Sequence, residues 1–197
     1  MTPYSVGILL FNEVEVLDFA GPFEVFSLAG NSKTNAKLFD VQTVSENGNL
    51  VIARNDLQVQ PNFSITNHPA FDLIIIPGGY GAEEIEIHNE RIITWIQQQA
   101  KQATIIASVC TGALLLAKAG LLNGLTATTH WMDLDRLEKE FPHVLVQRNV
   151  KFVDEDTIIT SGGISAGINM SFHLVSKLCG QQVALETAKR MEYDIEL

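Results

Sequence analysis

The sequence has few of the residues that stabilise small secreted domains or that attract nucleic acids. It contains two cysteines, Cys110 and Cys179, and neither belongs to a C-x-x-C or other zinc-like spacing. This excludes a disulfide framework and gives no cysteine-based metal site. Its 13 Lys and Arg face 23 Asp and Glu, for a formal net charge of −10, and no basic cluster compensates. We therefore expect no nucleic-acid partner and no anionic membrane partner.

Long hydrophobic runs are also missing. No apolar run reaches the roughly 18 residues that span a bilayer. The first apolar run, residues 6–11, has no basic segment before it and is not expected to be a signal peptide. We see no repeat, linker or low-complexity tract, and 46% of the residues are hydrophobic, enough for a substantial core. These features predict one domain over residues 1–197, located in the cytoplasm.

Strand-like and helix-like segments alternate along the chain. Such alternation predicts an α/β fold with a largely parallel sheet and helices on both faces. We also expect a hairpin turn at Asn47-Gly48 and an interruption of the first helix at Gly21-Pro22. The expected strands are residues 5–11, 39–45, 71–76, 104–109, 151–153 and 157–161. The expected helices are residues 14–29, 89–103, 111–119, 131–141, 166–179 and 181–193.

The segment from Ser108 to Gly112 follows a buried strand and opens a helix, with Cys110 at its centre. Small residues two before and two after a nucleophile permit the sharp turn of a nucleophile elbow. Such a turn presents the side chain at the carboxyl end of the sheet, where open α/β sheets bind ligands. The helix N-terminus is expected to favour the reactive thiolate. The alternative is a buried structural cysteine, since free thiols are often packed in cores.

Two glycine loops are candidates to complete this site. Gly78 and Gly79 end a central strand, and with the Thr111 N–H they would form a pair of oxyanion donors. The alternative is a turn that only ends the strand. Gly162-Gly163 also follows a strand and would form a wall near Cys110, a weaker assignment.

A partner acid or base is also needed. Asp18 lies among apolar residues just after the first strand, where a carboxylate is costly unless it is paired or used; its alternative role is a helix cap. His130 lies in a small turn with apolar neighbours and is either a base, a pocket residue or a core histidine. No histidine and carboxylate group has convincing metal spacing.

Four segments together resemble the DJ-1/PfpI superfamily, in its branch of isonitrile hydratases and of amidotransferase-like domains of AraC-type regulators. The most specific is ASVCTGALLLAKAGLLNGLTATTHW, residues 107–131. The others, in the same order as in that branch, are LDFAGPFEVF, DLIIIPGG and SGGISAGINM. The resemblance covers nearly the whole chain. It implies a flavodoxin-like three-layer α/β sandwich of the class I glutamine amidotransferase type, and a homodimer.

The resemblance also implies roles for single residues. Cys110 matches the family's cysteine nucleophile, Asp18 the acidic residue bonded to it, and Thr111 the threonine that follows the cysteine in isonitrile hydratases. Protease-like members carry histidine at that next position, so a Cys-His peptidase is disfavoured. Tyr80 stands where small residues are frequent in the hydratase branch, and Asn169 stands where that branch often has Asp.

The leading hypothesis is therefore a lyase that hydrates an isonitrile to an N-substituted formamide. Cys110 would attack the terminal carbon and Asp18 would transfer protons, with no cofactor. One alternative is a glyoxalase-like enzyme acting on α-oxoaldehydes. The other is a non-catalytic domain that senses a ligand or oxidation through Cys110.

Overall fold

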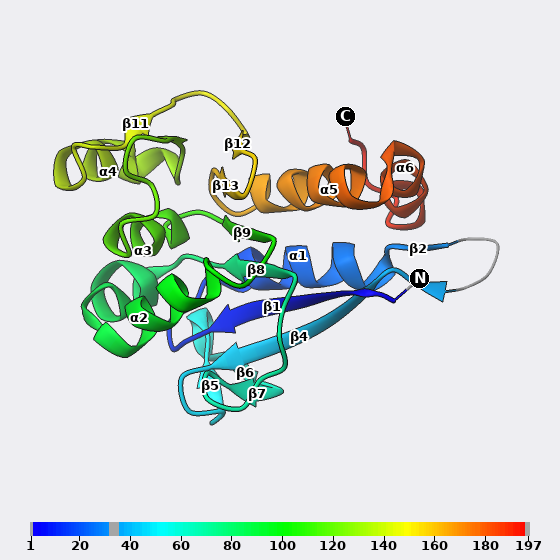
Figure 1. Ribbon diagram of the computed structural model, residues 1–197, viewed down its shortest axis with the longest axis horizontal. Helices are drawn as coiled ribbons and strands as arrows, with labels where there is room; N and C mark the ends of the chain where they lie inside the picture. The colour runs from blue at the N-terminus through cyan, green and yellow to red at the C-terminus, as the bar shows by residue number, and fades with distance from the viewer. Residues whose placement is uncertain (1, 32–35, 196–197) are drawn as a thin grey trace.

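A seven-stranded sheet forms the centre of this computed structural model, which describes residues 2–31 and 36–195 (Figure 1). The strand order is β12-β13-β9-β8-β1-β4-β7, and all neighbours are parallel except β12 and β13. The strands are β1 (Tyr4–Leu10), β4 (Phe39–Ser45), β7 (Phe63–Ser64), β8 (Leu73–Ile76), β9 (Ile105–Ser108), β12 (Phe152–Glu155) and β13 (Ile158–Ser161). The predicted, largely parallel sheet is thus confirmed.

Helices cover the sheet in two groups. The helices α1, α5 and α6 contact one another, and α2 contacts α3, which gives the predicted three-layer α/β fold. The helices are α1 (Val16–Leu28), α2 (Glu90–Gln99), α3 (Gly112–Lys118), α4 (Leu134–Glu140), α5 (Ala166–Cys179) and α6 (Gln181–Arg190). Short helical turns are η1 (Arg54–Asp56), η2 (Gly81–Ile85), η3 (Glu86–His88) and η4 (Trp131–Asp133). None of the helices in the described ranges is long and apolar enough to cross a membrane.

The core lies on the central strands, which are covered on both faces. Ile8 of β1, Ile75 of β8 and Ala107 of β9 are all fully buried. Parallel strands buried on both sides consist of continuous apolar runs rather than alternating ones, which is why the sequence identified them. Asn89 caps the N-terminus of α2, because its side chain accepts a hydrogen bond from the Arg91 N–H.

Two local predictions were wrong. Gly21-Pro22 does not interrupt α1, which runs through Pro22 as one helix. The buried side chains of Phe19, Val25 and Phe26 hold both halves against the sheet, so packing outweighs the hydrogen bond that proline removes. Asn47-Gly48 is a turn, but the strands beside it do not pair with each other, so it closes no hairpin.

Six short strands form separate two-stranded pairs that the sequence did not reveal. They are β2 (Gly30–Asn31) with β3 (Ala36–Lys37), β5 (Val51–Ile52) with β6 (Gln58–Val59), and β10 (Thr126–Ala127) with β11 (Leu145–Val146). The β5–β6 pair is joined to the loop after β1, since the Glu13 N–H donates to the Ile52 carbonyl at 2.8 Å. That loop leads into α1 and so into the candidate site.

Candidate active site

The carboxyl ends of four parallel strands meet at one edge of the sheet. The loops after β8, β9 and β13 carry Gly78, Cys110 and Gly162 respectively, and Asp18 lies in the first turn of α1, the helix that follows β1. Hydrogen bonds join these loops: Gly78 N–H donates to Asp18 Oδ2 at 3.0 Å, and Cys110 N–H donates to the Gly162 carbonyl at 3.2 Å. The topology therefore brings together residues that are up to 144 positions apart in the sequence (162 − 18).

Cys110 has the backbone geometry of a nucleophile elbow. Its φ is 55°, in the left-handed region that costs a non-glycine residue energy and clusters at functional sites. Gly112 makes the turn possible, because a Cβ there would lie 2.1 Å from the Ile76 carbonyl oxygen. The cysteine is 6% exposed. Strain held in place by a tight approach of this kind distinguishes Cys110 from a cysteine that merely fills the core.

Asp18 is a fully buried carboxyl that forms no ion pair with any cationic side chain of residues 2–31 and 36–195. One oxygen accepts the Gly78 N–H, while Oδ1 has no hydrogen bond of standard geometry to any described residue. Burial raises the pKa of Asp18 to about 7, against the partial opposition of the Gly78 N–H and the Cys110 thiol. A carboxyl with a pKa near neutrality is suited to both accepting and donating a proton.

The Cys110 thiol is held in its neutral form. Burial is the main reason that its pKa is raised, and the neighbouring Asp18 and Glu83 carboxylates add to this, while the Thr111 N–H opposes it. The expectation that the helix N-terminus would favour the thiolate was therefore wrong, because desolvation outweighs the single backbone donor. Thiol and carboxyl form a coupled pair in which ionising both groups is unfavourable.

Both glycines of the loop after β8 have their N–H groups engaged within the site. Gly78 binds Asp18, and the Gly79 N–H donates to Thr111 Oγ1 at 2.9 Å. Thr129 adds a further tie, since its Oγ1 donates to the Cys110 carbonyl at 2.8 Å. The glycine loop is thus bonded directly to Asp18 and Thr111, and these bonds occupy the two N–H groups that the sequence predicted as oxyanion donors.

His130 lies at the edge of this site. Its Nδ1 is 3.6 Å from Asp133 Oδ2, and its side chain is 20% exposed. The ring packs so closely on Gly163 that a Cβ there would lie 2.0 Å from His130 Cδ2. His130 therefore contacts the loop after β13 and Asp133 of η4.

Two residues of the site were missed by sequence reasoning. Glu83, in η2, is near enough to raise the pKa of the thiol. Ile164 has a φ of 54°, and a hydrogen bond from its backbone lowers the pKa of Asp18. Glu83 could have been found as a carboxylate that closely follows the Gly78-Gly79 loop, in addition to Asp18. No local sequence pattern marks Ile164.

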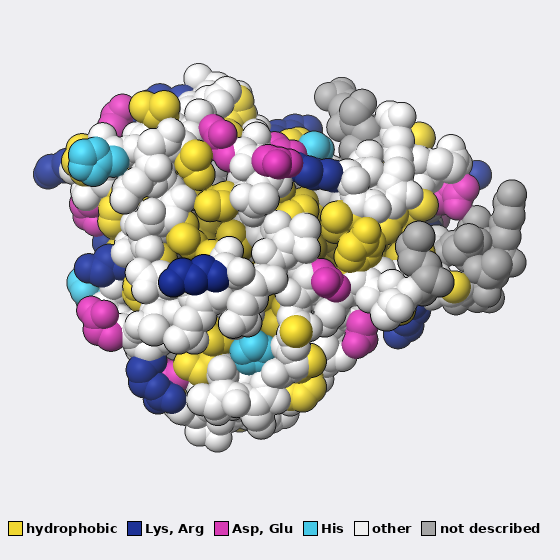
Figure 2. Space-filling view, in the orientation of Figure 1, with side chains coloured by type: hydrophobic (Ala, Val, Ile, Leu, Met, Phe, Trp, Pro, Cys, Tyr) yellow, Lys and Arg dark blue, Asp and Glu magenta, His cyan; other side chains and the backbone are white. Residues whose placement is uncertain are grey.

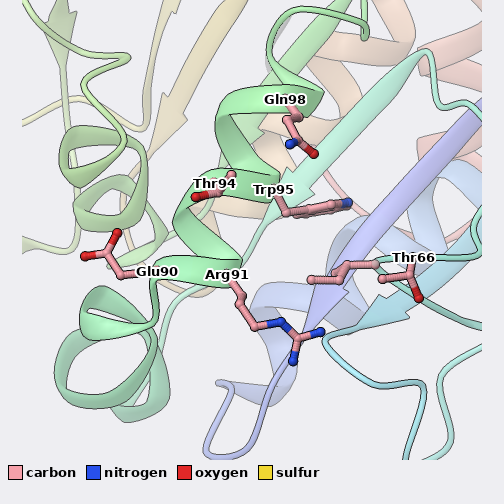
Figure 3. Close-up of a pocket in the computed structure, with 7 residues that line it drawn as sticks. Thr66, Glu90, Arg91, Thr94, Trp95 and Gln98 are labelled. Atoms are coloured by element: carbon pink, nitrogen blue, oxygen red, sulfur yellow. The ribbon is translucent and has the colours of Figure 1, made fainter.

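A separate cavity of about 350 Å³ lies on α2, away from these loops (Figure 3). Arg91 and Trp95 project from α2 toward the segment that contains Thr66. The cavity shares no lining residue with the Cys110 site. The second cysteine, Cys179, is partly buried at the end of α5, and burial raises its pKa. Over residues 2–31 and 36–195, no three His, Cys, Asp or Glu side chains are grouped to hold one metal ion.

This geometry defines an α/β protein with an elbow cysteine paired to a buried carboxyl. The sequence model of the DJ-1/PfpI family matches residues 4–177. The chain belongs to the DJ-1/PfpI family.

Its relatives include an enzyme and regulators. It is 35% identical to an isonitrile hydratase of Pseudomonas putida, over 96% of this chain and 78% of that protein. It is 31% identical to the HTH-type transcriptional regulator GbdR of Pseudomonas aeruginosa, over 98% of this chain, but it spans only about half (51%) of that regulator's length. A ThiJ/PfpI family protein of Pseudomonas syringae has a similar structure, with a TM-score of 0.88, 25% identity and coverage of 100% of this chain and 78% of the other.

Proposed function

We propose that the protein is a cysteine-dependent hydratase that converts an isonitrile and water into an N-substituted formamide. The observation that carries this proposal is the buried Asp18–Cys110 pair, a neutral thiol beside a carboxyl whose pKa is about 7. The relationship to an isonitrile hydratase supports the choice of substrate.

The reaction would proceed in two stages. The ionised Asp18 carboxylate takes the thiol proton as Sγ bonds to the terminal isonitrile carbon, and it then returns the proton to that carbon, leaving a thioformimidate on Cys110. Water adds to this carbon: Asp18 takes one of its protons and passes it to the nitrogen, which leaves a tetrahedral adduct on Cys110. The carbon–sulfur bond then breaks as the C=O bond forms, and Asp18 carries the proton of the adduct's hydroxyl to the sulfur. The formamide leaves, so that one isonitrile and one water give one N-substituted formamide and the thiol and carboxylate are restored.

The remaining site residues would hold this pair in place. We assign Gly78 the positioning of Asp18, because its N–H binds that carboxyl, and Gly79 the positioning of Thr111. The Thr111 N–H, which acts on the sulfur, would stabilise charge at the reacting atoms. His130 would line the substrate entrance. No cofactor enters this scheme.

The direct test is turnover of an isonitrile by the purified protein, followed as formamide in a chromatographic assay. We expect formamide from the wild-type protein and none from Cys110→Ala. Absence of product over a range of isonitriles, with the protein folded by circular dichroism, would refute the hydratase. The same assay with α-oxoaldehydes tests the glyoxalase alternative.

A sensing role is a second candidate, favoured by the relationship to transcriptional regulators. In this role Cys110 would be oxidised by peroxide to sulfenic or sulfinic acid. Mass spectrometry of the Cys110 peptide after mild peroxide treatment tests this role, and oxidation of Cys179 instead would count against it.

We propose that the described surface itself contacts no nucleic acid. The net charge of −10 supports this, and on the face shown in Figure 2 the Lys and Arg side chains do not merge into one patch.

We also propose that the protein is a homodimer and acts in the cytoplasm. Apolar side chains are exposed on α1, at Leu17 and Phe23, and on or directly beside the strands of the β5–β6 pair, at Leu50, Ile52 and Leu57. The pair is bonded to the loop before α1, so these side chains belong to neighbouring elements. An apolar surface of this kind is suited to a second copy. A mass near 21.7 kDa by light scattering, that of one chain, would refute the dimer.

The proposed location in the cytoplasm is supported by the two free thiols, which suit a reducing compartment.

A further inference from the structure

The backbone of Cys110 is tied at both ends to segments that follow other strands. Its φ of 55° is strained, so partners must hold its polar groups in this conformation. The Cys110 N–H donates to the carbonyl of Gly162, after β13, at 3.2 Å. The Cys110 carbonyl accepts the hydroxyl of Thr129, after β10, at 2.8 Å, and it also accepts the Ala113 N–H of α3 at 3.3 Å. A side chain distant in sequence therefore helps to hold the elbow.

Thr129 is itself firmly placed. The residue is 2% exposed. The N–H of the preceding residue, Thr128, donates to Thr160 Oγ1 of β13 at 2.9 Å. A Cβ on Gly162 would lie 3.8 Å from the Thr129 carbonyl oxygen, so the loops after β10 and β13 lie side by side. A hydroxyl on a backbone anchored in this way can fix the position of the group that it binds.

The peptide group between Cys110 and Thr111 transmits this bond to the sulfur. The peptide bond is trans, so the Cys110 C=O and the Thr111 N–H lie in one plane and point in opposite directions. Thr111 precedes α3, and its N–H has no acceptor within that helix. This N–H acts instead on the Cys110 sulfur, where it opposes the raised pKa of the thiol. The Thr129 hydroxyl thus sets the direction of this N–H and, by polarising the peptide, strengthens it as a donor.

We propose that Thr129 is a positioning residue for the nucleophile: its hydroxyl holds the Cys110–Thr111 peptide so that the Thr111 N–H stabilises the negative charge that develops on the sulfur. Thr129 exchanges no proton and touches no substrate in this role. The inference concerns the reactivity of the thiol, and it rests on the proposed hydratase only where it is extended to turnover.

The test is the rate at which iodoacetamide alkylates Cys110 at a fixed pH, followed on the Cys110 peptide by mass spectrometry. Thr129→Val removes the hydroxyl and keeps the branched shape, and it should lower the rate by about threefold to tenfold, the effect of losing one hydrogen bond. Thr129→Ser keeps the hydroxyl and should react at close to the wild-type rate. A role in packing alone would give the opposite order, because valine matches the volume of threonine and serine does not.

The matched control is Thr187→Val in α6. Thr187 is 3% exposed and its hydroxyl donates to the Val183 carbonyl at 2.7 Å, so this substitution removes the same kind of bond from a different part of the fold. It should leave alkylation of Cys110 unchanged. Urea unfolding checks that each variant is folded. If Thr129→Val does not fold, Thr129→Ser and Thr129→Ala give the same comparison, since they differ in the hydroxyl alone.

The inference would be overturned if Thr129→Val reacted at the wild-type rate or faster, or if Thr129→Ser were as slow as Thr129→Val. An equal loss in Thr187→Val would also overturn it. In isonitrile turnover, Thr129→Val should lower kcat and leave KM nearly unchanged, because the hydroxyl acts on the nucleophile and not on substrate binding. A wild-type protein without turnover would refute the hydratase and leave the alkylation result standing, so the two failures are distinguishable.

Discussion

Asp18 and Asp154 show how differently one fold treats the same side chain. Asp18 is fully buried and has no cation beside it, and its pKa is raised to about 7. Asp154, on β12, is also partly desolvated, but hydrogen bonds from His173 Nε2 at 2.7 Å and Lys177 Nζ at 2.9 Å outweigh this and lower its pKa. Asp18 can therefore exchange a proton near neutral pH. Asp154 stays ionised and links β12 to α5, and we call its contacts with His173 and Lys177 the clamp.

The difference teaches that a carboxyl's role is decided by its partners rather than by burial alone. A cation and several donors convert a costly group into a stabilising one, whereas a thiol and two backbone N–H groups, those of Gly78 and Ile164, leave most of the cost at Asp18 in place. A buried carboxyl that is left uncompensated beside the ends of the central strands is typical of a functional site, where the carboxyl takes part in the chemistry. The following predictions test this contrast, from the largest expected effect to the smallest.

Removing the sulfur should have the largest effect. Cys110→Ala is expected to lower isonitrile turnover by about 10⁴-fold or more, since the neighbouring hydroxyls of Ser108 and Thr111 are far weaker nucleophiles than a thiol. Cys179→Ala, the matched control at the end of α5, should retain activity. The measurement is formamide production by both variants, and equal activities in the two variants would contradict the assignment of Cys110.

Replacing the proton carrier should have the next largest effect. Asp18→Asn keeps the shape but cannot exchange the proton, so kcat should fall by about 10² to 10⁴-fold. Because the general base must be ionised, kcat/KM of the wild-type protein should rise as the pH passes through about 7 and then level off. The residual activity of Asp18→Asn should lack this rise. A wild-type profile flat between pH 5 and 9 would remove Asp18 from the chemistry.

Stability should change in the opposite direction to activity. The folded pKa of Asp18 lies above the ordinary value of 3.8, so ionising it opposes folding, and the cost grows as the pH rises from about 4 to 7. Above pH 7 this cost is at most about 4 kcal/mol. Asp18→Asn should therefore be more stable than the wild-type protein in urea at pH 8, and the difference should shrink toward pH 4. A less stable variant at pH 8 would show that the carboxylate is compensated.

The clamp should show the reverse sign and a smaller size. The lowered pKa of Asp154 means that its contribution is present above the ordinary value of 3.8 and is lost as the pH falls through the folded value. Asp154→Asn should cost about 1 kcal/mol of unfolding free energy at pH 7, because the pair is partly exposed to solvent. Urea unfolding measures this, with turnover as the control: a large loss of activity with stability unchanged would contradict a purely structural role.

The site could be predicted from the sequence to the extent that local patterns carry it. The small residues around Cys110 and the strand before it point to an elbow, and Asp18 stands out as a carboxylate in an apolar helix. Glu83 and Ile164 could not be found in this way. Their effect on the pKa values of Cys110 and Asp18 depends on which loops the sheet brings together. A single sequence contains no information on the distances between those loops.

What the sequence by itself determined is the order of strands and helices, the elbow at Cys110 and the acidic balance of the surface. Each depends on local geometry or composition: periodicity, turn residues and the count of charges. Only the tertiary structure decided that α1 continues through Pro22 and that the thiol is neutral. It also decided that the N–H groups of Gly78 and Gly79 bind Asp18 and Thr111. The physical reason is the same in each case: packing and desolvation arise when distant segments meet, and here they outweigh helix-breaking propensity and the attraction of a helix N-terminus.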